Sequence, residues 1–244
     1  MTAIPGWPEG LGLRRYESLD STNEEARRLA KSAMRGPVWI VSREQTAGRG
    51  RRGRVWISES GNLFATLLMP ATTSLSAQLG FVAGLAAADA IAAQAPGAEV
   101  TLKWPNDVLL NGKKVAGILL EGLGKDSLAI GIGINLAHYP NSTEVPSISI
   151  AAVTGNLPDL NAILLRLASA MTAWYEIWLR QGFQPVRKAW LLRASGLGHP
   201  IRARLADSER EGVFEDLDED GALLLRDAAG TLTRITAGDV FFRP

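Results

Sequence analysis

An Asn-Gly pair, Asn111-Gly112, joins two apolar runs in the segment KWPNDVLLNGKKVAGILLEG, residues 103–122. This dipeptide between such runs is the strongest short-range signal for a two-residue β-hairpin, because both central positions of the turn take φ above zero. We therefore expect the chain to fold around an antiparallel sheet with a fixed register. The expected cross-strand pairs are Leu110 with Lys113, Leu109 with Lys114, and Asp107 with Ala116.

Polar groups gather at one end of this hairpin. The expected register puts Asp107 and Lys114 on one face as diagonal neighbours, about 7 to 8 Å apart, so that a ligand fits between them. In TLKWP the strand ends at Pro105, which brings Lys103, Asn106 and Asp107 together. The apolar run VAGILL indicates that Lys114 lies at the rim of a buried sheet, whereas its neighbour Lys113 is expected to be an ordinary surface charge.

A third polar group follows in LAIGIGIN, residues 128–135. Strand alternation puts Gly131, Gly133 and Asn135 on one face. Two bare positions beside an amide suit a flat ligand lying against the strand, and they equally suit close packing against a helix. Both interpretations stay open at the level of sequence.

The remaining patterns alternate between helix and strand. DSTNEEARRLAKSAM predicts a helix from about Thr22, with Ser21 and Glu24, or Thr22 and Glu25, as a capping box. Further helices are expected over residues 74–94, 159–179 and 185–193, and strands over residues 38–42, 62–70 and in four runs up to residue 135. These elements predict a sheet packed with helices.

The last fifty residues have a different pattern. ASGLGHP, residues 194–200, reads as a linker, and five short strands follow, divided by DSER, DEDG and DAAG. That spacing predicts a small antiparallel barrel. We place the domain boundary between residues 1–193 and 194–244, and expect the barrel to lean on the main domain because it is too small to hold much core alone.

Composition narrows the chemistry. The chain has no cysteine and only two histidines, His138 and His199, so thiolate chemistry, a histidine metal cluster and a Ser-His-Asp triad are excluded, and no dedicated metal site is expected. The longest apolar run, residues 81–93, is shorter than the roughly 20 residues that span a bilayer. No signal-peptide pattern opens the chain, so a cytoplasmic location is expected.

The loop GRGRRGR, residues 48–54, carries four arginines and spells GxGxxG. A dinucleotide site requires a helix after the glycines, and the β-leaning RVWISES follows instead. Two interpretations remain: a solvated basic loop, or a lid that binds an anion, since glycines admit a ligand closely and guanidinium groups suit phosphate or carboxylate. Repulsion among the arginines predicts that the loop stays mobile until an anion neutralises it.

Together, GRGRRGR followed by Trp56, KWPNDV with KKVAGILLE, GIGIN and the upstream DSTN resemble the biotin protein ligases over nearly the whole chain. The resemblance implies that the chain joins biotin and ATP into biotinyl-5'-AMP, with magnesium and with release of pyrophosphate. It then implies transfer of biotin to one lysine of a biotin carboxyl carrier domain. The implied fold is of the α+β class: a mixed sheet packed with helices, like class II aminoacyl-tRNA synthetases, followed by an SH3-like barrel.

The same resemblance assigns site residues by motif position. Those implied to contact biotin are Ser21, Thr22, Asn23, Gln45, Arg49, Gly50, Arg51 and Lys114. Those implied on the ATP and adenylate side are Arg49, Arg51, Arg54, Trp56, Lys103, Asn106, Asp107 and Asn135. The glycines implied to supply pocket backbone are Gly48, Gly117, Gly131 and Gly133. The chemistry is implied for Lys114, Arg51, Lys103 and Asp107, the last either orienting the acceptor lysine or taking its proton.

Two other functions stay open. Lipoate and octanoate transfer enzymes resemble this catalytic domain, and a nucleic-acid-binding module would use the arginine loop, although the net charge of +1 stands against it. Because DSTN begins at Asp20, no N-terminal winged helix and no operator DNA are expected. No membrane partner is expected either, since no apolar run is long enough to span a bilayer. An exposed sheet edge near the hairpin would suit a homodimer or the carrier domain.

Overall fold

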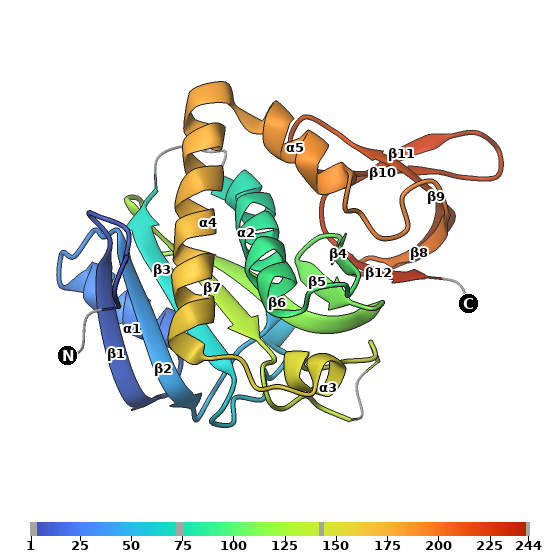
Figure 1. The fold of residues 1–244 in the computed structure, drawn as a ribbon. Coiled ribbons are helices and arrows are strands. Elements are labelled where there is room, and N and C mark those ends of the chain that lie inside the picture. Colours follow the sequence, from blue (N-terminus) through green and yellow to red (C-terminus); the bar gives the residue numbers. More distant parts are fainter. Residues whose placement is uncertain (1–3, 72–75, 142–143, 243–244) are drawn as a thin grey trace.

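The computed structural model describes residues 4–71, 76–141 and 144–242. Within them a seven-stranded mixed sheet forms the centre of the molecule, in the order β1-β2-β3-β7-β6-β5-β4 (Figure 1). Only β1 and β2 pair in parallel; the other neighbours are antiparallel. The strands are β1 (Gly12–Leu19), β2 (Val38–Gln45), β3 (Leu63–Pro70), β4 (Val100–Lys103), β5 (Asp107–Leu110), β6 (Lys113–Gly122) and β7 (Ser127–Ile134).

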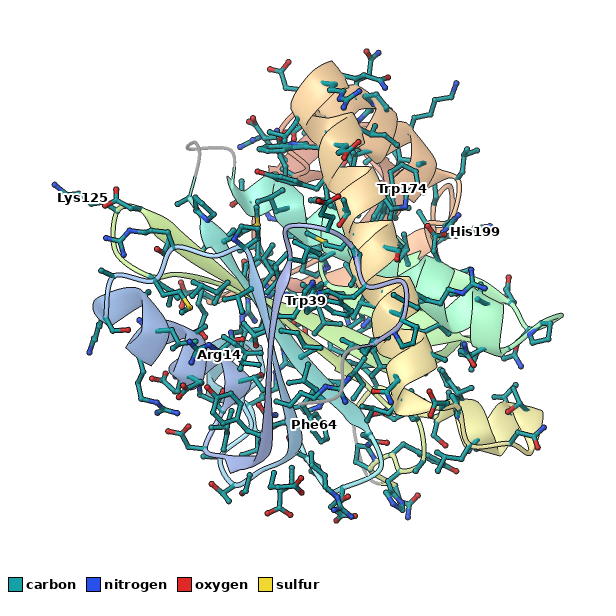
Figure 2. The ribbon with its side chains drawn as sticks, turned by 60° about the vertical axis from the view of Figure 1, so that its left-hand side comes forward. Arg14, Trp39, Phe64, Lys125, Trp174 and His199 are labelled. Atoms are coloured by element: carbon teal, nitrogen blue, oxygen red, sulfur yellow. The ribbon has the colours of Figure 1, made fainter. Side chains whose placement is uncertain are left out.

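Helices cover both faces of this sheet because its strands are apolar on both sides. Trp39 and Val41 of β2 pack into the large core with α2 (Leu79–Gln94) and α4 (Leu160–Gln181), which lie side by side in Figure 1. Val38 and Ile40 point to the other face and pack against α1 (Thr22–Lys31). In Figure 2, Trp39 and Phe64 lie inside the molecule, and both are almost fully buried.

Most predicted helices are confirmed, with shifted ends. α1 begins at Thr22 as expected, but the capping box is wrong, since Ser21 is the N-cap and its side chain makes no cap hydrogen bond. α4 begins after Asp159, which accepts a hydrogen bond from the N–H of Ala162 at 2.8 Å. α5 (Phe183–Leu191) begins before Pro185, and α2 follows a 3-10 turn, Ser76–Gln78. The predicted start of that helix, at residue 74, lies outside the described residues.

The C-terminal region forms a five-stranded antiparallel sheet, in the order β11-β10-β9-β8-β12, next to α5 (Figure 1). Its strands are β8 (Pro200–Arg204), β9 (Glu209–Leu217), β10 (Leu223–Arg226), β11 (Leu232–Ile235) and β12 (Asp239–Phe242). Buried residues such as Phe214 and Val240 belong to the same core as α2. The prediction that the barrel leans on the main domain is therefore confirmed, while the exact boundary at residue 193 stays a prediction.

The linker closes part of the sheet edge that was expected to be open near the hairpin. Leu102 of β4 donates its N–H to the carbonyl of Arg193 at 2.7 Å and accepts from the N–H of Ser195 at 2.8 Å. The backbone of Leu102 is therefore already hydrogen-bonded by the linker and is not open to a partner strand. A homodimer through this edge stays a prediction. No helix in the described residues is both long and apolar enough to cross a membrane.

Candidate active site

The β5–β6 hairpin turns at Asn111 and Gly112, whose φ angles are 49° and 74°. The pairs of Leu110 with Lys113 and Leu109 with Lys114 are confirmed. The predicted pairing of Asp107 with Ala116 is wrong, because the register shifts between Val108 and Leu109 and places Asp107 opposite Gly117. The two side chains meet directly, with Lys114 Nζ 2.6 Å from Asp107 Oδ1, so the spacing predicted between these neighbours is bridged by an ion pair.

A second lysine shares this carboxylate. Lys103, at the end of β4, is 5% exposed, and its Nζ lies 3.8 Å from Asp107 Oδ2. Burial lowers the pKa of Lys103, against the attraction of Asp107, which raises it. The ring of Phe241, from β12 of the barrel, lies 5.6 Å from the same ammonium group. Two ammonium groups around one carboxylate leave this corner with a surplus of positive charge.

The N-terminal turn of α1 forms a neutral, hydrogen-bonded end of the site. Gln45 Oε1 accepts from the N–H and the hydroxyl of Thr22, at 2.8 and 3.1 Å. Thr66 Oγ1, which is buried, lies 2.8 Å from Thr22 Oγ1 and 2.6 Å from Asn23 Oδ1. Thr22 and Asn23 are therefore buried polar groups held by partners from β2 and β3, while Ser21, also buried, donates its N–H to Asp20 Oδ1 at 2.7 Å.

The arginine loop folds into a tight turn over this region. Gly50 donates its N–H to the carbonyl of Arg54 at 2.7 Å, and Arg49 pairs with Val55 as an isolated antiparallel bridge. Carboxylates of the chain itself hold the arginines: Arg49 pairs with Glu24 and with Glu121, and Arg51, Arg52 and Arg54 surround Asp239. The prediction that the loop stays mobile considered only a bound ligand as a source of negative charge. In the structure, carboxylates of the chain itself supply negative charge next to the loop.

The glycines of β6 and β7 support an indole ring. A Cβ added at Gly133 would lie 2.5 Å from Cε2 of Trp56, and one at Gly117 would lie 2.9 Å from Cζ3 of the same ring. Gly131 instead admits the side chain of Asn23 from α1. Side chains of the protein itself cover both glycines, and Asn23 on Gly131 comes from a helix, as the helix-packing interpretation expects. The flat-ligand interpretation stays a prediction.

Most of these groups line one cavity of about 270 Å³. Every site residue predicted from the sequence contributes to its wall except Gly48. Gly48 lies behind the wall, where the side chain of Ser58 and the carbonyl of Trp56 leave no room for a Cβ. Within residues 4–71, 76–141 and 144–242, no three histidine, cysteine, aspartate or glutamate side chains gather to hold a metal ion.

Comparison with known proteins shows which protein family has this architecture. Residues 16–136 match the model described as the Biotin/lipoate A/B protein ligase family, and residues 196–243 match the Biotin protein ligase C terminal domain. The chain is 48% identical over 235 residues to the biotin-[acetyl-CoA-carboxylase] ligase of Paracoccus denitrificans, covering 91% of this chain and 97% of that protein. The chain belongs to the biotin protein ligase family.

Other ligases are similar over most of their length. The bifunctional ligase/repressor of Bacillus subtilis is 33% identical, over 92% of this chain and 72% of that protein. The biotin protein ligase of Aquifex aeolicus in complex with biotin and ATP superposes with a TM-score of 0.83 at 29% identity, covering 95% of this chain and 98% of that one. These matches confirm the α+β fold class, with a mixed sheet and a C-terminal barrel domain of the ligase type.

Some groups at this candidate site could not be predicted from the sequence. The barrel contributes Asp239 and Phe241 to the cavity wall, and Thr66 holds α1 from behind. A lone aspartate in a short strand and a lone threonine in an apolar strand look like ordinary barrel and core residues. Their roles depend on how the barrel and α1 dock, which long-range packing determines.

Proposed function

We propose that this chain is a biotin protein ligase that joins biotin and ATP into biotinyl-5'-AMP and transfers biotin to one lysine of a biotin carboxyl carrier domain. One observation carries the proposal: a single cavity has a neutral, hydrogen-bonded end at the start of α1 and a cationic end at Lys103, Lys114, Arg51 and Arg54. The first end suits the uncharged ring system of biotin, and the second suits a carboxylate meeting a triphosphate.

In the first step a biotin carboxylate oxygen bonds to the α-phosphorus of ATP, and the bond from that phosphorus to the bridging oxygen breaks, so that pyrophosphate leaves with the electron pair. Two anions must approach each other, and fixed cations offset their repulsion. Lys114 is placed to turn from Asp107 to the substrate carboxylate, so that its charge stays paired. No side-chain nucleophile is required, which suits a chain without cysteine.

In the second step the amine of the acceptor lysine attacks the acyl carbon, and AMP leaves. When Lys114 turns to the adenylate, it releases Asp107 Oδ1, with which it forms an ion pair in the structure. That oxygen then orients the amine or accepts its proton. We infer that Asp107 serves the second step only after Lys114 has been recruited to the first.

Magnesium enters this scheme with the substrate, bound to the phosphates of ATP. The carboxylates in the cavity wall, Asp107, Asp239 and Glu144, are each paired with lysine or arginine. Such paired carboxylates do not provide the oxygen-rich, negatively charged shell that a resident magnesium ion needs. The arginine and lysine side chains would contact the remaining phosphate oxygens.

The adenylation half-reaction tests the proposal without any carrier. Incubation with biotin, ATP and magnesium should form biotinyl-5'-AMP, detected by mass spectrometry, and lipoate in place of biotin should give no adenylate. Lys114→Ala should reduce the yield by at least about a hundredfold, as expected for loss of a group that stabilises transition-state charge. Lys113→Ala is the matched control, since Lys113 is the exposed neighbour in the same strand. Equal yields from the two variants would refute the role of Lys114, and preference for lipoate would refute the substrate.

A further inference from the structure

Two turns of the barrel have the same construction. In DEDGA, residues 218–222, and in DAAGT, residues 227–231, the carboxylate of the first aspartate accepts the N–H groups two and four residues later, at 2.8 to 2.9 Å. The fourth residue of each turn is a glycine, Gly221 or Gly230, with φ angles of 89° and 83°. An aspartate acceptor and a left-handed glycine are enough to form such a turn. What sets the two turns apart is their surroundings.

The DEDGA turn packs against the main domain. A Cβ added at Gly221 would lie 2.5 Å from Cε2 of Phe81 in α2, whereas one added at Gly230 would meet no atom within 4 Å. The carbonyl of Gly221 also accepts a hydrogen bond from the indole N–H of Trp104, at 3.1 Å. Trp104 is buried, so loss of this bond would leave a buried polar group unpaired. The DEDGA turn is therefore a docking contact of the barrel.

The docked tryptophan directly follows Lys103, the last residue of β4. The barrel also reaches Lys103 itself, since the ring of Phe241 in β12 lies 5.6 Å from its ammonium group. A Cβ added at Gly238, just before β12, would lie 3.7 Å from Cζ3 of Trp104. The barrel thus contacts two consecutive residues at the end of one short strand. Where the Lys103 ammonium lies in the cavity wall depends on how the barrel docks.

We propose that Trp104 is a positioning residue, through which the DEDGA turn of the barrel fixes Lys103 for the phosphates of ATP. Trp104 and Gly221 do not belong to the cavity wall, so they act through Lys103 and not on the substrate. A misplacement of about 1 Å is enough to cost about a hundredfold in rate. The role of Lys103 toward ATP rests on the proposed function, whereas its support by the barrel rests on the contacts described above.

Gly221→Ala tests the proposal, with Gly230→Ala as the matched control. Both changes put a Cβ on a left-handed glycine in the same kind of turn, but only the first pushes against Phe81. In biotin-dependent pyrophosphate exchange, Gly221→Ala should raise the KM for ATP about fivefold or more and leave the KM for biotin unchanged, because α1 holds the other end of the cavity. Adding Phe81→Leu makes room for the Cβ and should restore the KM for ATP. A merely structural role would lower the melting temperature without separating the two substrates.

Trace acetylation with acetic anhydride tests the support of Lys103 without any substrate. Lys103 is buried and Lys113 is exposed, so mass spectrometry of the peptides gives both labelling rates from one sample. Gly221→Ala should raise the rate at Lys103 relative to Lys113 about fivefold, because the end of β4 opens more often, and Gly230→Ala should keep the wild-type ratio. Trp104→Phe removes the same hydrogen bond from its other partner and should move both readouts in the same direction. Melting temperatures should show that all variants are folded.

A wild-type labelling ratio in both Gly221→Ala and Trp104→Phe, or an equal rise in Gly230→Ala, overturns the support of Lys103 by the barrel. A raised ratio with an unchanged KM for ATP would refute the positioning role toward ATP. Failure of the wild type to form biotinyl-5'-AMP would instead refute the proposed function, and the labelling ratio would still decide whether the barrel supports Lys103.

Discussion

Replacing Gly133 with alanine should push the indole of Trp56 away from the sheet and weaken ATP use. The added Cβ would lie 2.5 Å from Cε2 of the ring and 2.7 Å from both Cζ2 and Nε1. Carbon atoms in contact are about 3.5 to 4.0 Å apart, so the ring must move by about 1 Å or more. Gly117 lies under the same ring, with its would-be Cβ 2.9 Å from Cζ3, so the ring has room only toward the cavity.

Overpacking of this kind costs about 1 to 3 kcal/mol. If the whole cost falls on the position of the arginine loop, kcat/KM for ATP falls by about 5-fold to 150-fold. The assay is biotin-dependent exchange of pyrophosphate into ATP. Gly122→Ala is the matched control, because Gly122 ends β6 and an added Cβ there would meet no atom within 4 Å.

A second measurement tests the proposed cause. Gly133→Ala combined with Trp56→Ala should lower the melting temperature by less than the sum of the two single changes, since the second change removes the clash. Wild-type kcat/KM and wild-type melting temperature in Gly133→Ala would refute the stacking of the indole on this glycine.

Three further substitutions test the residues that hold the loops and helix α1 around the site. Asn62 Oδ1 accepts the N–H groups of residues 136–138 at 2.9, 2.9 and 3.0 Å, so Asn62→Ala should lower the free energy of unfolding by about 2 to 5 kcal/mol in chemical denaturation, and a loss below about 1 kcal/mol would contradict this. A hydrogen bond from Arg28 lowers the pKa of Asp20 from 3.8 to about 2, so its stabilisation is present above about pH 4 and is lost as pH falls toward 2. The pair is half exposed, so the advantage of the wild type over Asp20→Asn should be under about 1 kcal/mol at pH 5, and most of it should be lost near pH 2, where the carboxyl is about half protonated in the folded protein; an advantage as large at pH 2 as at pH 5 would contradict this pKa. Thr66→Val removes the hydroxyl that holds α1 and should raise the KM for biotin by about 5-fold to 30-fold with kcat little changed, whereas a fall in kcat alone would place the hydroxyl elsewhere.

Short sequence patterns were enough to predict those turns and element ends that depend mainly on neighbouring residues. The Asn111-Gly112 turn depends on neighbouring residues alone and was predicted correctly, and the start of α1 at Thr22 was also predicted correctly. The strand predicted to end at Pro105 ends two residues earlier, at Lys103. The register shift between Val108 and Leu109 was not predicted, because it depends on how β6 fits both β5 and β7. Two elements, β1 and α3 (Ile150–Thr154), were missed. The sequence of β1, GLRRYESL, mixes charged and apolar residues without strict alternation, since this edge strand is only partly buried.

The residues of the candidate site divide in the same way, into those that a local motif predicts and those that only long-range packing determines. Residues within one motif were predicted to lie together, and nearly all of them line the cavity. The partners of the arginine loop were not predicted, because Arg54 and Asp239 are 185 residues apart and meet only when the barrel docks on the main domain. Charge counting along the chain misses such pairs, and so the loop looked unpaired in the sequence.

The most direct test of the proposed function is transfer to an acceptor. The enzyme is mixed with biotin, ATP, magnesium and a biotin carboxyl carrier fragment, and the mass of the fragment is measured by mass spectrometry. The ligase reaction predicts the mass gain of one biotin, lost when either biotin or ATP is omitted. No gain on a fragment that another biotin ligase does modify would contradict the proposed function.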